Sequence, residues 1–126
     1  MDASQPATQE VIEQLELARQ LMRIDPDQPY AILTVAYYAY LSEEYTLCQD
    51  LYRRYVTLFP EEAAGWNNLA LTHKRSGDYR EEERLYRRAL SLEPGNANTK
   101  NNLAVNLAHQ GRFSEAEHTQ TRTWLW

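Results

Sequence analysis

The stretch LEPGNA, residues 92–97, looks like an ordinary helix-breaking turn until it is compared with LFPEEA at 58–63 and IDPDQP at 24–29. The prolines that these stretches share are spaced 34 residues apart: Pro26, Pro60 and Pro94. Proline cannot continue a helix and disfavours the helical conformation in the residue before it, so each stretch ends one helix and lets another begin. The spacing therefore predicts a chain built from 34-residue repeats.

The repeat extends beyond the prolines. With units starting at residues 29, 63 and 97, the seventh and eighth positions always hold a hydrophobic residue and an alanine: Val35-Ala36, Leu69-Ala70 and Leu103-Ala104. A polar turn later precedes an aromatic ring, expected to fill the gap at the turn: Tyr45, Tyr79 and Phe113. Gly77 and Gly111 lie in this turn, where glycine adopts a left-handed conformation without steric penalty. Each unit is therefore predicted to be a helix, a tight turn and a second helix.

Within each unit, apolar residues recur at the spacing of amphipathic helices, as in Trp66, Leu69 and Ala70. A lone helix is expected over 8–24, before the first complete unit. The expected helix pairs are 30–42 with 45–58, 64–76 with 79–92, and 98–110 with 113–126.

The chain resembles the tetratricopeptide repeat family, whose 34-residue signature is W-x2-L-G-x2-Y, A-x3-F and a final P. The middle unit carries Trp66-x2-Leu69-Ala70-x2-His73, then Glu82-x3-Tyr86 and Pro94, whereas the third departs with Gln120 where an aromatic is expected. The resemblance implies an all-α, right-handed solenoid of three helix pairs plus a leading helix. The implied organisation is a flexible N-terminus (1–7) and one domain (8–126), divided into a half repeat (8–28), two full repeats (29–62, 63–96) and a truncated third (97–126).

Composition narrows the classes of partner and compartment. The 126 residues are 43% hydrophobic and 25% charged, which is typical of a folded domain, and the net charge of −5 argues against a nucleic-acid partner. The single cysteine, Cys48, cannot form an internal disulfide, and MDASQPATQE lacks the pattern of a signal peptide. No apolar run approaches 18 residues, so we expect no membrane insertion and a cytoplasmic location.

Catalytic and metal-binding patterns are missing from the sequence. His73 occupies a slot usually filled by a packed aromatic, and His109 and His118 have no ligand cluster at suitable spacing. The run Glu81-Glu82-Glu83 is flanked by arginines and is interpreted as a solvated helix face. There is no phosphate loop and no nucleophile elbow, so we expect no enzyme activity, no cofactor, no metal and no small-molecule substrate.

The family resemblance implies that the first helices of successive pairs line a concave groove that binds a peptide or a partner helix. This surface changes from aromatic to amide-rich and cationic along the chain, whereas Tyr38 is expected to point into its helix pair. The predicted groove residues are Tyr30, Leu33, Tyr37 and Tyr40 in the first unit, Asn67, Asn68, Leu71, Lys74 and Arg75 in the second, and Asn98, Asn101, Asn102, Val105 and His109 in the third.

Asn68 and Asn102 share one repeat position, which Thr34 fills in the first unit. Two interpretations stay open: these amides hold a peptide backbone, or they satisfy neighbouring carbonyls. The carboxylate clamp that holds chaperone tails in similar proteins would need its residues at Leu33, Tyr37, Asn68, Asn98 and Asn102. Only Asn68 matches, which argues against a clamp.

The expected last helix carries Trp124 and Trp126 at positions that are apolar in earlier repeats. They could belong to a longer array, fold back on the last pair, or contact a second copy in a homodimer. We predict a non-catalytic protein-interaction module with a protein or peptide partner. The alternatives are a self-associating spacer that uses Trp124 and Trp126, or a chaperone for secreted effectors.

Overall fold

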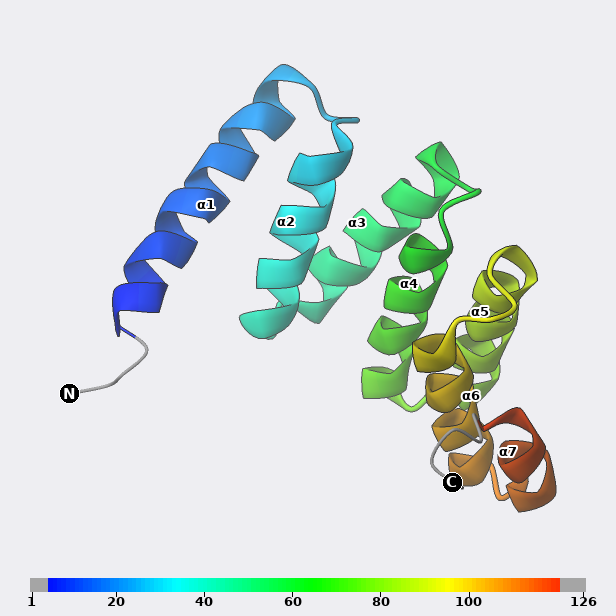
Figure 1. The fold of residues 1–126 in the computed structure, drawn as a ribbon. Coiled ribbons are helices and arrows are strands. Elements are labelled where there is room, and N and C mark those ends of the chain that lie inside the picture. Colours follow the sequence, from blue (N-terminus) through cyan, green and yellow to red (C-terminus); the bar gives the residue numbers. More distant parts are fainter. Residues whose placement is uncertain (1–4, 121–126) are drawn as a thin grey trace. The chain divides into compact units, whose positions relative to one another are not determined.

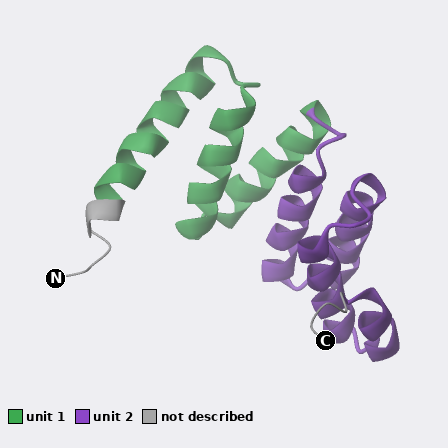
Figure 2. Cartoon of the chain, viewed as in Figure 1, with its two compact units in different colours: residues 1–58 green, residues 59–126 purple. Residues whose placement is uncertain are grey.

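A computed structural model describes residues 5–120, and in this range the chain forms seven helices and no strand (Figure 1). The helices are α1 (Gln5–Ile24), α2 (Pro29–Leu41), α3 (Tyr45–Leu58), α4 (Ala63–Ser76), α5 (Tyr79–Leu92), α6 (Ala97–His109) and α7 (Phe113–Thr119). The predicted all-α class of helix-turn-helix units is confirmed. The chain divides into two compact units, residues 1–58 and 59–126 (Figure 2). The single domain expected over 8–126 stays a prediction.

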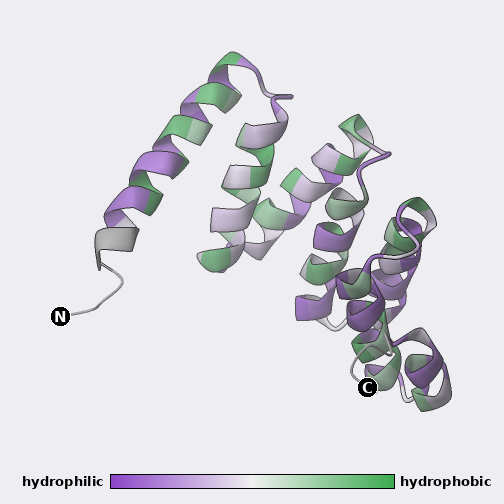
Figure 3. Cartoon of the chain, viewed as in Figure 1, coloured by the Kyte–Doolittle hydropathy of each residue, from purple (hydrophilic) through white to green (hydrophobic). Residues whose placement is uncertain are grey.

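In the first unit, α2 packs against both α1 and α3. Proline at the first helical position and the Gln28 side chain, which accepts a hydrogen bond from the Ala31 amide at 2.8 Å, start α2. Ala36 is fully buried, and its small side chain lets the paired helices approach closely. The hydropathy view shows α1 alternating between hydrophilic and hydrophobic residues, whereas α2 is pale or green along its length (Figure 3).

In the second unit, α5 packs against α4 and α6, and α7 packs against α6. The core is built from the predicted alanines and from large side chains of the second helices, among them Tyr86 and Leu85, which are almost fully buried. Gly77 ends α4 in the left-handed conformation with φ of 76°, as its place in the repeat predicts. Asp78 then caps α5 by accepting a hydrogen bond from the Glu81 amide at 3.3 Å.

In the first repeat, residues 29–62, Glu43 takes the place of the glycine that ends the first helix in the other two repeats. It occupies the repeat position of Gly77 and Gly111 and adopts the same left-handed conformation, with φ of 63°. A residue with a Cβ is strained there, whereas glycine is not. The turn geometry is therefore common to all three repeats although the residue is not.

The predicted end of the last helix is wrong. The helix expected over 113–126 ends at Thr119, and Gln120 is extended with ψ of 141°. Its repeat equivalents, Tyr52 and Tyr86, are buried and hold their helices to the core, whereas α7 has no buried residue. At the other end, α1 begins at Gln5, three residues before the predicted start of the leading helix at residue 8. The flexible N-terminus expected over 1–7 stays a prediction.

Candidate functional site

Helix α2 presents an unusual surface, because none of its residues is charged: PYAILTVAYYAYL. Its buried side faces the neighbouring helices, yet Tyr30 is 49% exposed and Tyr37 is 52% exposed on the outside. Exposed aromatic rings on an uncharged helix leave a large apolar area in contact with water. This surface is the strongest candidate for partner binding in the first unit.

A pocket of about 350 Å³ opens on this surface, between α1 and α2. Its lining residues are Gln14, Tyr30, Leu33, Thr34, Tyr37 and Tyr38. The Tyr30 hydroxyl donates a hydrogen bond to Gln14 Oε1 at 3.0 Å, so this ring has a fixed polar end. Three of the four predicted groove residues of the first unit therefore lie in one pocket. Sequence reasoning missed Gln14, although the assignment of α1 as the second helix of a half repeat could have placed it beside α2.

Two further tyrosines of α2, Tyr38 and Tyr40, contact neighbouring aromatic rings. Tyr38, expected to point into the helix pair, is half-buried and lines the pocket, with its ring edge-on to Tyr37 at a centroid distance of 5.1 Å. Tyr40 is half-buried and contacts Tyr45 edge-on at a centroid distance of 5.8 Å, near the turn, and its place in the groove stays a prediction. The repeat frame placed these rings on the correct helix, but their surroundings depend on the packing of side chains around them.

The amides of the second unit join helices to each other. Asn67 Oδ1 accepts hydrogen bonds from Thr99 Oγ1 and from Asn102 Nδ2, both at 3.2 Å, which links α4 to α6. Asn102 therefore donates to another side chain, whereas Asn68 at the equivalent position is half-buried in α4. Among the other predicted groove residues here, Leu71 is half-buried, and Lys74, Arg75 and Asn98 are exposed.

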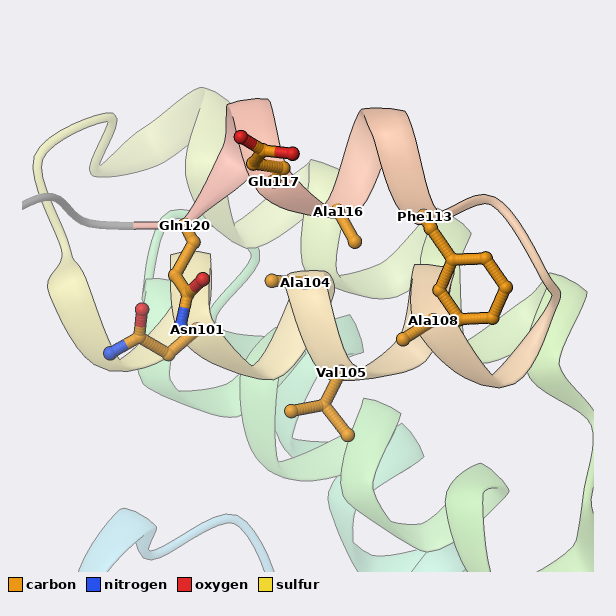
Figure 4. Close-up of a pocket in the computed structure, with 8 residues that line it drawn as sticks. All are labelled: Asn101, Ala104, Val105, Ala108, Phe113, Ala116, Glu117 and Gln120. Carbon is orange, nitrogen blue, oxygen red and sulfur yellow. The ribbon is translucent and has the colours of Figure 1, made fainter.

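A second pocket, of about 440 Å³, lies between α6 and α7 and is lined by Asn101, Ala104, Val105, Ala108, Phe113, Ala116, Glu117 and Gln120 (Figure 4). Asn101 and Val105 are predicted groove residues. Phe113 is 68% exposed, so the expectation that it fills the gap at the turn is wrong. Tyr45 and Tyr79 at the equivalent position are half-buried. The self-association residues Trp124 and Trp126 lie outside the described residues.

The prediction of a solvated glutamate face is wrong for Glu82, which is 1% exposed. Helix α6 packs over it, and the fully buried Asn106 donates through Nδ2 to Glu82 Oε1 at 3.0 Å and to the Tyr79 carbonyl at 2.8 Å. Gln110 Nε2 in turn donates to Asn106 Oδ1 at 2.8 Å. Glu82 stands where the family pattern has alanine, so its carboxyl group needs the amide of the following repeat.

Glu83 continues this polar network toward α7. Arg112 Nη1 approaches Glu83 Oε1 at 2.7 Å, and the same guanidinium contacts both oxygens of Glu115 at 2.9 and 2.8 Å. Burial raises the pKa of Glu83, but hydrogen bonds from Arg112, Gln110 and Arg87 outweigh this effect and lower its pKa to about 2. The network thus joins α5, α6 and α7 through an ionised carboxylate.

His73 and His109 each contact a neighbouring side chain. His73 is buried, with Nδ1 3.9 Å from Asp78 Oδ2, and the ring of His109, a predicted groove residue, packs against Tyr79 at a centroid distance of 5.3 Å. Across residues 5–120, no group of three or more histidine, cysteine or acidic side chains is placed to hold a metal ion. Within the same range, no helix combines the length and the apolar character needed to cross a membrane.

Comparisons with known proteins agree with this architecture. Structures of MamA are similar: a crystal structure of MamA protein has a TM-score of 0.76 at 17% identity, over 83% of this chain and 57% of its own. MamA 41-end from Desulfovibrio magneticus RS-1 has a TM-score of 0.80 at 12% identity, over 90% of this chain and 64% of its own. The chain therefore spans less than two thirds of these structures. At such low identity the similarity shows the fold alone.

Sequence comparisons match a shorter part of the chain than the structural comparisons do. No match was found among curated protein sequences. A family model described as tetratricopeptide repeat matches residues 67–92 and 96–120, which together make up less than half of the chain. These segments contain all of α5, α6 and α7 and most of α4. The predicted family is thus confirmed, and the chain carries tetratricopeptide repeats at residues 67–92 and 96–120.

Proposed function

We propose that this protein is a non-catalytic protein-interaction module that binds a peptide or a partner helix on the outward faces of its first helices. The observation that carries the proposal is the uncharged surface of α2, where exposed Tyr30 and Tyr37 flank a pocket of about 350 Å³. Pockets lined by aromatic side chains with a few polar groups are typical of binding sites.

The chemistry of this pocket favours an apolar or aromatic side chain of the partner. Tyrosine offers a large contact area at low conformational cost, and its hydroxyl supplies a hydrogen bond. Gln14 and Thr34 add donors and acceptors at the pocket wall that could align a peptide backbone. Affinity would thus come from ring contacts, and orientation from the polar groups.

We propose no catalytic role for the polar cluster around Glu82, Glu83 and Arg112, because these side chains are engaged in contacts between helices. We also propose a reducing, cytoplasmic compartment, because the single cysteine, Cys48, is a buried free thiol, and its burial raises its pKa to about 11.

The groove proposal is tested by panning a peptide-display library against the protein and measuring the Kd of recovered peptides by calorimetry. Replacing Tyr37 with alanine should weaken binding by about tenfold or more, because truncated interface tyrosines commonly cost over 1 kcal/mol. Leu47→Ala, which truncates an exposed residue of α3, is the matched control and should leave the Kd unchanged. Equal affinity of the Tyr37 variant and the wild type would refute the proposal.

A second candidate function is favoured by the pocket between α6 and α7. Its exposed Phe113 and Val105 could be covered by another copy of the chain, which would make the protein a self-associating spacer. Light scattering over a dilution series decides this point. A dimer mass that falls on dilution, and is lost in Phe113→Ser, would support the spacer function, and a constant monomer mass would exclude it.

A further inference from the structure

The negative charge of the chain is concentrated in its first compact unit. Residues 1–58 carry nine acidic side chains against four arginines and hold no lysine or histidine, whereas residues 59–126 carry nine acidic side chains and nine lysines and arginines. The first unit therefore accounts for the whole net charge of −5. An excess of one sign favours partners of the opposite sign, because it speeds their approach and disfavours like-charged ones.

Part of this charge lies beside the pocket between α1 and α2. Gln14 lines the pocket from α1, and Glu10 lies one turn before it on the same face, since residues four apart in a helix are neighbours. Glu13 directly precedes Gln14, and both glutamates are exposed. The arginines of α1, Arg19 and Arg23, come five and nine residues after Gln14. At about 3.6 residues per turn, both lie on the side of the helix away from Gln14.

Neighbouring cations do not neutralise Glu10 and Glu13. Arg23 lies 3.5 Å from Glu16, so this arginine is engaged with a different acid. Glu13 accepts a hydrogen bond from Gln9 at 3.2 Å, and neither Glu10 nor Glu13 forms an ion pair with another residue of the described range 5–120. Their charges are therefore available to a partner that fills the adjacent pocket.

The pocket and its surroundings differ in chemistry. The six lining residues are all uncharged, so the pocket itself selects an apolar or aromatic side chain. Leu17, which is 50% exposed, lies one turn after Gln14 on the same face of α1. The methylene stem of an arginine or a lysine can cover such a leucine while its charged end reaches a carboxylate. The surface thus offers an apolar hollow with a negatively charged rim.

We propose that the partner segment that binds this pocket is basic. A large apolar side chain enters the pocket, and flanking arginine or lysine side chains lie against Glu10 and Glu13. This inference rests on the proposed peptide-binding function and adds the charge of the ligand to it. The faces of Tyr30 and Tyr37 attract cations and reinforce the preference. An acidic segment would meet like charges at the rim and is selected against.

Peptide selection tests the charge of the partner. A random display library panned against the full chain at low salt should return peptides in which arginine or lysine flanks a large apolar residue. Calorimetry with one such peptide should show a Kd about three- to tenfold higher for the double variant Glu10→Gln/Glu13→Gln, because exposed ion pairs contribute modestly. Glu44→Gln/Asp50→Asn removes the same charge from two other exposed acids of the unit and should leave the Kd unchanged. Circular dichroism checks that both variants are folded.

Recovered peptides without net positive charge would overturn the inference, and so would equal Kd values for the two double variants. A dimer in light scattering that Tyr37→Ala abolishes would make a second copy the occupant and would overturn it too. Tyr37→Ala also separates the inference from the function on which it rests. If only Tyr37→Ala weakens peptide binding, the binding function holds and the basic partner is wrong. If Tyr37→Ala has no effect, the binding function itself fails.

Discussion

The pairs α4–α5 and α6–α7 are built on the same repeat positions, yet one buries a glutamate and the other exposes a phenylalanine. Glu82 is 1% exposed because α6 supplies Asn106 above it, whereas Phe113 is 68% exposed on a pair that no other described helix covers. In a repeat protein, burial is therefore decided by the neighbouring repeat as much as by the residue. A chemically costly residue is tolerated where the neighbour provides its partner.

The largest expected effect comes from removing that partner. Asn106→Ala takes away the amide that donates to the buried Glu82 carboxyl, and it should lower the free energy of unfolding by about 2–4 kcal/mol. Urea denaturation followed by circular dichroism measures the loss. Adding Glu82→Ala, which copies Ala116 of the next pair, should recover most of it. If the double variant is as unstable as the sum of both single variants, the two side chains do not form a coupled pair.

A smaller effect is expected from the link between the two pairs. The folded pKa of Glu83 is lowered to about 2 from an ordinary value of 4.5, so its contribution to stability is complete above about pH 5 and is lost as pH falls toward 2. We expect a loss of about 1–2 kcal/mol, since Arg112 and Arg87 are partly exposed. Urea titrations at pH 7 and pH 3 should show this loss in the wild type and a smaller one in Glu83→Gln. Parallel pH dependence in both proteins would contradict the assignment.

The smallest expected effect lies in the turn of the first unit. Glu43→Gly replaces a strained left-handed residue with the one used at Gly77 and Gly111, and should stabilise the protein by about 0.5–1 kcal/mol. Thermal unfolding measures this gain, with Glu44→Gly as a control that should destabilise. An unchanged or lower Tm for Glu43→Gly would show that the exposed Glu43 side chain makes a favourable contact that offsets the strain.

Much of the fold could be predicted from the repeat frame. The frame located the buried alanines and the left-handed Gly77. Close packing of paired helices and the turn between them need these residues at fixed positions of the repeat, so the 34-residue period reveals them. It could not locate the buried state of Glu82, since its partner Asn106 is brought near only when α6 packs against α5. The sequence predicted the part of the pocket that α2 forms, because Tyr30 and Tyr37 lie on one helix face. It did not predict Gln14, because that residue comes from the neighbouring helix α1.

The pairing of Glu82 with Asn106 also gives the array a fixed order. If the segment 63–96 were duplicated in tandem, the new copy would place Thr72, rather than Asn106, over the first Glu82. A threonine hydroxyl is shorter than an asparagine amide and cannot donate to both the carboxyl group and the Tyr79 carbonyl. Copying this unit would therefore leave a buried acid without its partner. The order of these two repeats is therefore fixed by the hydrogen bond between Glu82 and Asn106, and the repeats are not interchangeable.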